Sequence, residues 1–122
     1  NLLPFVKVIS GVQDQDLAGY YANAHALIFM TFHEGFGYPI IESNACGVLA
    51  VCSDLPVLKE VTGAFNIFLP NDFEDVNWKE ILEKIHDPIL RDFSKNHVIK
   101  MYSIDQSSKR LESLDCFTSG HF

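Results

Sequence analysis

The chain has 122 residues and a formal net charge of −7, and 48% of its residues are hydrophobic. This length and composition predict one domain with an apolar core. Nucleic acids and anionic bilayers are bound by clustered Lys and Arg, so the acidic balance argues against both as partners. No run of about 18 apolar residues and no cationic, apolar N-terminal segment is found, so neither a transmembrane helix nor a signal peptide is predicted.

The three cysteines are Cys46, Cys52 and Cys116, and no Cys-x-x-Cys pair occurs among them. An odd number without paired spacing predicts reduced thiols in a cytoplasmic protein. The spacing also offers no ligand set for zinc, so no metal site is predicted.

Apolar runs alternate with helical patterns in the first half of the chain, which predicts an α/β fold with a parallel sheet. Strands are predicted over residues 5–9, 26–30, 49–52 and 66–69. Asp14 is expected to cap a helix that runs to about Asn23, and Asp54 is expected to cap a short helix that starts at Pro56. After Pro70 the pattern becomes helical, with helices predicted over 76–86, from Pro88 onward, and over 103–114.

The segment Glu34-Gly-Phe-Gly-Tyr-Pro-Ile-Ile-Glu42 places two carboxylates eight positions apart around two glycines and a proline. Pro39 suits the first position of a helix, and Gly47 suits the left-handed position just after a helix end. The pattern therefore predicts a tight loop that opens a helix. Free backbone amides near residues 36–41 would then form a site for an anion such as a phosphate.

This segment resembles the second half of the C-terminal domain of retaining glycosyltransferases with the GT-B architecture, in the large family four. The motif residues that carry the resemblance are Glu34, Gly35, Phe36, Gly37, Pro39, Glu42, Ala45, Cys46 and Gly47. It extends over roughly residues 5–115, through Gly11, Val12, Asp16, Leu17, Tyr21, Ala24 and Ala26 before the motif and Ser53, Asp54, Pro56, Lys59, Glu60 and Val61 after it.

The resemblance implies a three-layer α/β/α Rossmann-like parallel sheet that forms the incomplete C-terminal half of a GT-B fold. Residues 1–122 would be a single partial domain, the second half of a nucleotide-sugar-binding domain, with C-terminal helices at about 76–115. The implied activity is transfer of a hexosyl group, with retention, from a nucleotide-diphosphate sugar to an acceptor hydroxyl on a sugar, lipid or protein. The donor is a substrate, and no cofactor or metal is implied.

Residue roles follow from the same resemblance. Glu34 is expected to act as the catalytic-site residue that contacts hydroxyls of the transferred sugar, and Glu42 to accept hydrogen bonds from both ribose hydroxyls. Gly11 and Val12 are expected near the base. The backbone amides expected at the sugar and the distal phosphate are those of Gly35, Phe36, Gly37 and Tyr38.

In the family, two further strand–helix units and a cationic diphosphate clamp precede the part that this chain matches, and a separate N-terminal domain binds the acceptor. The usual strand order would leave a gap between the strands predicted at 5–9 and 26–30. Unpaired strand edges self-associate, so we expect self-association of the isolated chain. We also expect it to bind nucleotide weakly and to be a very poor catalyst.

Other interpretations remain open from the sequence. Glu34 can cap the helix N-terminus, Glu42 can be a solvated helix residue, and Phe36 can fill the core. At the level of the whole chain, one alternative is a non-catalytic remnant or interaction module with a Rossmann-like fold. Another is an unrelated doubly wound protein that binds a phosphate ligand at the carboxyl ends of its strands.

Overall fold

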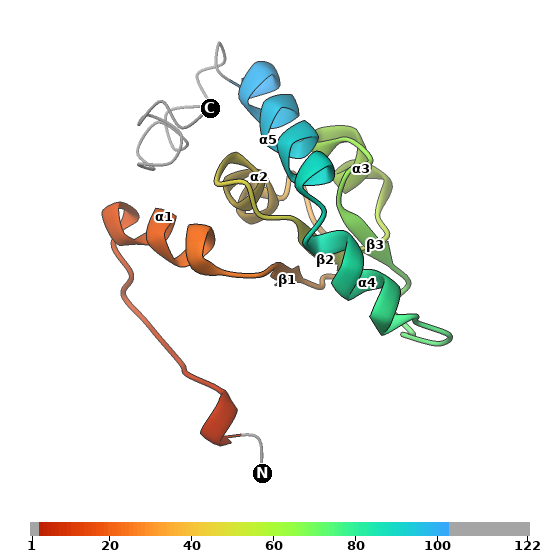
Figure 1. Cartoon of the computed structure of the whole chain (residues 1–122), viewed down its shortest axis with the longest axis horizontal. Coiled ribbons are helices and arrows are strands. Elements are labelled where there is room, and N and C mark those ends of the chain that lie inside the picture. The colour runs from red at the N-terminus through yellow and green to blue at the C-terminus, as the bar shows by residue number, and fades with distance from the viewer. Residues whose placement is uncertain (1–2, 103–122) are drawn as a thin grey trace.

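The computed structural model describes residues 3–102, which form three strands and five α-helices around a small parallel sheet (Figure 1). In chain order the elements are the 3-10 helix η1 (Leu3–Phe5), α1 (Asp14–Asn23), β1 (Leu27–Phe29), α2 (Tyr38–Ala45), β2 (Ala50–Ser53), α3 (Pro56–Thr62), β3 (Ile67–Leu69), α4 (Trp78–Ile85) and α5 (Pro88–Tyr102). None of these helices is both long enough and apolar enough to cross a bilayer.

The sheet has the order β1-β2-β3, and all its strands are parallel. In β2, Ala50 and Cys52 pack with residues of α2 and α3 on one face. Val51 points to the other face, where it packs with Ile81 and Ile85 of α4. Both faces are therefore covered by helices, as expected for a strand whose four residues are all buried. The predicted three-layer α/β/α arrangement is confirmed.

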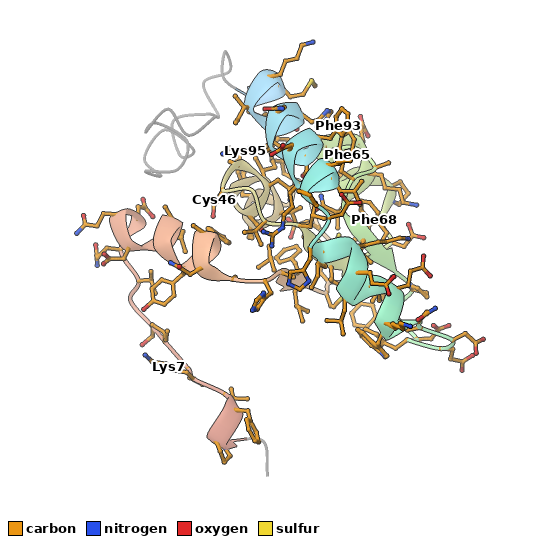
Figure 2. The ribbon with its side chains drawn as sticks, viewed as in Figure 1. Lys7, Cys46, Phe65, Phe68, Phe93 and Lys95 are labelled. Atoms are coloured by element: carbon orange, nitrogen blue, oxygen red, sulfur yellow. The ribbon has the colours of Figure 1, made fainter. Side chains whose placement is uncertain are left out.

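A third apolar cluster lies between helices rather than on the sheet. It joins α1, α2 and α5 through Ala18, Ile41, Ala45, Val98 and Tyr102. The aromatic side chains Phe65 and Phe93 add a further contact, with parallel rings whose centroids lie 6.1 Å apart (Figure 2). Helix α5 is thus held along the outside of α2 and beside the loop that leads into β3.

A polar network is buried where α2, α3 and the starts of β2 and β3 meet. Asn44 and Asn66 exchange two hydrogen bonds of 2.9 and 2.8 Å through their side-chain amides. Asn66 Oδ1 also accepts from Ala50 N at 2.8 Å, and Asn66 Nδ2 donates to Thr62 Oγ1 at 3.2 Å. Asn44 Nδ2 also donates to Val48 O at 3.0 Å. Each amide group is paired, which is what allows it to be buried.

The strand predicted over residues 5–9 does not form. Residues 3–5 form η1, and the following segment is extended and paired with no described strand (Figure 1). The segment is exposed, and Val8 is 89% exposed. A strand gains its stability from ladder hydrogen bonds, and this segment makes none. The expected gap in the sheet is therefore absent. The outer edge of β1 also pairs with no described strand, and self-association through it stays a prediction.

Two predicted caps are wrong. The N-cap of α1 is Gln13 rather than Asp14, and that of α3 is Leu55 rather than Asp54. Asp54 instead forms an ion pair with Lys59, 2.6 Å from Nζ to Oδ1. The other helices begin and end close to their predicted positions, except that the helix predicted over 103–114 lies outside the described residues.

The two cysteines in the described residues differ. Cys52 is free, as predicted, and it is buried. Cys46 takes part in a disulfide, so the prediction that it is a reduced thiol is wrong.

Candidate functional site

The loop after β1 is fixed to the end of β2. Thr31 N donates to Ser53 Oγ at 2.7 Å, and Thr31 Oγ1 donates to His33 O at 2.7 Å. Both strands end here, so the loop lies at the carboxyl edge of the parallel sheet. Ligands of open α/β sheets bind at this edge.

Glu34 stabilises the turn that follows it. Its Oε1 accepts hydrogen bonds from Gly35 N at 3.1 Å and from Phe36 N at 3.4 Å. The carboxylate thus binds amides of its own loop, and the N-cap of α2 is Gly37. The interpretation of Glu34 as a helix cap is therefore wrong. Its hydrogen bonds stabilise the loop before the helix, which is also a structural role.

The amides predicted to be free between residues 36 and 41 are only partly free. Phe36 N is bonded to Glu34, while Ile40 N and Ile41 N donate to Gly37 O at 3.0 and 3.3 Å. Pro39 has no N–H. Within the described residues, this leaves the N–H groups of Gly37 and Tyr38 without a hydrogen-bond acceptor, at the positive end of the α2 dipole.

Gly37 is required by the local backbone. Its φ of 82° lies in the left-handed region, and a Cβ at this position would lie 2.7 Å from Leu58 Cδ2. The loop therefore packs closely against α3. Gly47, with φ 77°, occupies the predicted left-handed position after α2.

Phe36 serves the core. Its ring packs against the α1–α2–α5 cluster, with centroids 4.8 Å from the Tyr38 ring and 5.7 Å from the Tyr102 ring. The interpretation of Phe36 as a core residue is confirmed, and only its backbone remains a candidate for ligand contact.

A cavity of about 470 Å³ opens beside Glu34. Its walls are the β1–α2 loop and the start of α3, through Phe32, His33, Glu34, Gly35, Leu55, Pro56 and Val57. The wall is mostly apolar and carries one carboxylate, so it suits a small ligand with hydroxyl groups better than an anion.

Glu42 lies on the side of α2 that faces α1. It is 2% exposed, and its Oε2 accepts a 2.8 Å hydrogen bond from Tyr21 OH. The interpretation of Glu42 as a solvated helix residue is therefore wrong. The bond fixes the carboxylate relative to α1.

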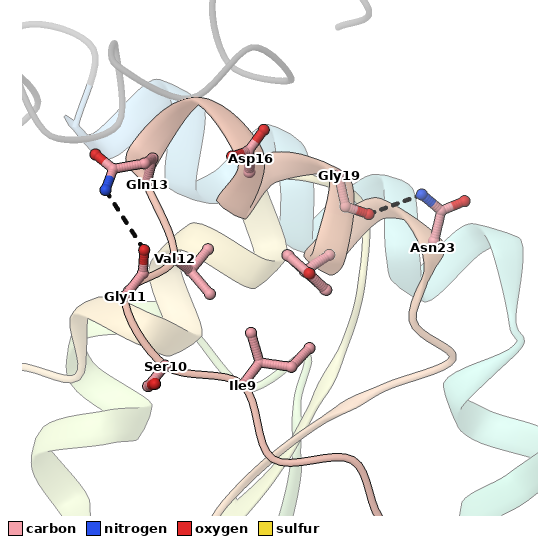
Figure 3. A pocket seen from close by; sticks show the side chains of 9 residues that line it. Ile9, Ser10, Gly11, Val12, Gln13, Asp16, Gly19 and Asn23 are labelled. Atoms are coloured by element: carbon pink, nitrogen blue, oxygen red, sulfur yellow. Dashed lines mark hydrogen bonds between the residues drawn. The ribbon is translucent and has the colours of Figure 1, made fainter.

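Gly11 and Val12 line a different cavity, of about 580 Å³, between the extended N-terminal segment and α1 (Figure 3). The backbone turns here at Gly11, with φ 69°, and Gly11 O accepts from Gln13 Nε2 at 3.4 Å. This cavity shares no lining residue with the one at Glu34. The structure thus brings Glu34, Gly35, Phe36, Gly37, Tyr38 and Glu42 onto one loop and helix, and leaves Gly11 and Val12 apart.

Tyr21 and Ser53 are the two polar residues near this site whose hydrogen bonds were not predicted from the sequence. Tyr21 lies on α1, and its hydroxyl reaches the neighbouring helix α2 at Glu42. Ser53 follows three buried strand residues, so a hydroxyl there had to bond to an adjacent loop.

Titration and metal chemistry add little at this edge. No group of three or more His, Cys, Asp or Glu residues in the described part of the chain lies close enough together to hold a metal ion. Burial, and to a smaller extent the charge of Asp54, raises the pKa of the Cys52 thiol to about 12. This thiol is a packing group rather than a nucleophile.

The sequence matches the family described as "Glycosyl transferases group 1" over residues 1–110. It is 35% identical over 91 residues to the O-antigen chain mannosyltransferase B of Escherichia coli and 32% identical over 97 residues to the serotype-specific mannosyltransferase WbdA of the same organism. It is 29% identical over 103 residues to the O-antigen chain mannosyltransferase RfbU of Salmonella typhimurium.

These similarities cover most of this chain and a small part of each relative. They span 74%, 79% and 82% of the chain, but 24%, 11% and 28% of the respective relatives. No solved structure matches.

Proposed function

Because the chain belongs to the group 1 glycosyl transferases, we propose that it forms the donor-binding part of an enzyme that transfers a hexosyl group from a nucleotide-diphosphate sugar. The relatives are mannosyltransferases, so mannose is the sugar that we propose first. The acceptor is a hydroxyl group. Retention of the configuration at the transferred sugar is proposed because the chain resembles retaining glycosyltransferases. We propose that the chain acts within a longer protein.

The observation that carries this proposal is the geometry at the carboxyl edge of the sheet. A carboxylate, a cavity of about 470 Å³ and the N-terminus of α2 lie on one loop–helix unit. Glu34 Oε1 is engaged by two loop amides, and a carboxylate has a second oxygen that can accept from sugar hydroxyls. The N–H groups of Gly37 and Tyr38 would meet the distal phosphate.

Glu42 and Tyr21 form the second part of the proposed site. Glu42 would accept the two ribose hydroxyls, and its bond to Tyr21 sets the orientation of the carboxylate before a ligand arrives. Gly11 and Val12 would contact the base only if the extended segment closes over α2, because the structure places them on a separate cavity.

Charge limits how tightly the isolated chain can bind. None of the described residues that line the cavity at Glu34 is Lys or Arg. Two helix amides contribute about 0.3–1 kcal/mol of electrostatic stabilisation to an anion. A diphosphate leaving group needs more, so we expect weak binding and negligible turnover from this chain by itself.

The test is thermal unfolding of the chain with UDP, GDP, ADP and their hexose conjugates at millimolar concentration. A ligand that binds only the folded state raises the unfolding midpoint. We expect one nucleotide sugar to do so, and Glu34→Gln and Glu42→Gln each to abolish the rise relative to the ligand-free midpoint of the same variant. Both substitutions keep side-chain size, and Glu42→Gln keeps an acceptor for Tyr21.

Glu60→Gln is the matched control, because it removes the same charge from an exposed position on α3. The ligand should raise the unfolding midpoint of Glu60→Gln as much as it raises that of the unmodified chain. A rise of equal size in Glu42→Gln would refute ribose recognition by this residue. No rise with any nucleotide would favour the alternative that the chain is a non-catalytic module.

A further inference from the structure

Two histidines meet at the opposite edge of the sheet from Glu34. His25 precedes β1 and His86 is the C-cap of α4, and both side chains are exposed. His25 Nδ1 lies 3.0 Å from His86 Nε2, and the ring centroids are 5.1 Å apart. The glycosyl-transfer site does not use them.

The hydrogen bonds assign the tautomers of the pair. His86 Nδ1 lies 2.8 Å from Leu82 O, a carbonyl that can only accept, so this nitrogen carries the proton. In neutral His86 the lone pair is then on Nε2, and His25 Nδ1–H donates to it. A histidine whose Nδ1–H is held by a backbone carbonyl and whose Nε2 is unprotonated is arranged as a metal ligand.

The backbone around the pair is fixed by Arg91. Its Nε donates to Ile85 O at 2.9 Å and one terminal nitrogen donates to His25 O at 3.1 Å. These two bonds join the residue before His86 to His25 itself. The two rings are thus presented at a set spacing although they are 61 positions apart in the chain.

We propose that His25 Nδ1 and His86 Nε2 form a bidentate site for a divalent transition-metal ion. Two imidazole nitrogens bound at 2.0–2.1 Å lie about 2.9–3.4 Å apart for ligand angles between 90° and 109°, and the observed separation is 3.0 Å. On binding, the His25 proton moves from Nδ1 to Nε2 through solvent, which frees the Nδ1 lone pair for the ion. Water completes the coordination, because the described residues supply no third His, Cys, Asp or Glu ligand.

The site selects ions by ligand type. Imidazole suits Cu²⁺, Ni²⁺ and Zn²⁺, whereas Mg²⁺ and Ca²⁺ prefer oxygen ligands. Cu²⁺ is expected to bind most tightly. The ion would join the C-terminus of α4 to the entry of β1 and stabilise the folded state.

The test is calorimetric titration of the untagged 122-residue chain with Cu²⁺, Ni²⁺, Zn²⁺ and Mg²⁺, followed by electron paramagnetic resonance of the Cu²⁺ complex. We expect one equivalent of Cu²⁺ with two coordinated nitrogens, and no Mg²⁺ binding. His25→Gln and His86→Gln should each weaken Cu²⁺ binding more than about tenfold. Loss of a residue that only hydrogen-bonds to a metal ligand already weakens affinity by about tenfold or more, and loss of the ligand itself should weaken it further. Metal-free melting curves establish that each variant is folded.

The double variant His33→Gln/His121→Gln is the control, because it removes two histidines outside the pair and should bind as the unmodified chain does. Absence of Cu²⁺ binding at millimolar concentration would overturn the proposal. So would binding that both single variants retain, or a copper spectrum without two nitrogen ligands.

Discussion

Replacing Asn66 by Leu tests whether the buried Asn44–Asn66 pair stabilises the fold. The substitution leaves two buried polar groups without partners, namely Ala50 N–H and Asn44 Oδ1. Thr62 Oγ1 keeps its 2.6 Å bond to Leu58 O, and Asn44 Nδ2 keeps Val48 O. An orphaned buried group costs about 1–3 kcal/mol, and the added apolar side chain offsets part of this. We expect a loss of about 2–5 kcal/mol in the free energy of unfolding.

Replacing Asn44, the other member of the pair, by Leu should lower the free energy of unfolding much less. In Asn44→Leu, Asn66 Oδ1 keeps Ala50 N and Asn66 Nδ2 keeps Thr62 Oγ1, while Val48 O keeps a 2.8 Å bond from Ser43 Oγ. No group loses every partner, so we expect a loss of about 0–2 kcal/mol.

Urea unfolding of both single variants and of the double variant measures these values and their coupling. The double variant should lose less than the sum of the single variants, because removing Asn44 also removes the carbonyl that Asn66→Leu orphans. Asn96→Leu, at an exposed position of α5, is the control and should change stability by less than about 0.5 kcal/mol. Equal losses in the two single variants would refute the hydrogen-bond argument.

Three further predictions concern packing, titration and surface charge. Gly37→Ala should lose about 2–4 kcal/mol from left-handed strain and overpacking against Leu58, whereas Gly35→Ala, where a Cβ meets nothing within 4 Å, should be nearly neutral; unfolding curves that do not separate the two would contradict the assigned turn. The folded-state pKa of Cys52 is raised from 9.0 to about 12, so its contribution to stability is complete below pH 9 and is lost as pH rises toward 12. The free energy of unfolding, measured across this pH range, should fall more steeply for the unmodified chain than for Cys52→Ala. Parallel pH dependences in the two proteins would count against the raised pKa. Lys59→Met removes an ion pair whose side chains are 47% and 48% exposed, so it should cost less than about 1 kcal/mol, and a larger loss that persists in 1 M salt would be the contrary result.

The parts of the fold that were predicted well are those specified by local patterns. The apolar runs at 26–30, 49–52 and 66–69 and the Pro-start and Gly-stop signals around α2 and α3 correspond to the observed β1, β2, β3, α2 and α3. The segment 5–9 is also mostly apolar but pairs with no described strand, and pairing is a tertiary property that composition does not report. Gly11 and Val12 were expected near the base of the donor, and the structure places them on a cavity separate from the one at Glu34.

The polar contacts were harder to predict. Glu34 and Glu42 were both candidates from spacing, yet the structure gives them different partners, loop amides for one and Tyr21 for the other. The Asn44–Asn66 and His25–His86 pairs join residues 22 and 61 positions apart. No local pattern marks such partners, because the fold alone brings them together.

The extended segment before α1 has a consequence for cleavage of the chain by proteases. Its backbone is exposed and lies outside any ladder, and proteases cut exposed segments of this kind first. A cut between Gly11 and Val12 would leave α1 to α5 and the sheet intact. The truncated product would retain Glu34, Glu42 and the α2 N-terminus but lose Gly11, so limited proteolysis would test whether the proposed base contact depends on this segment.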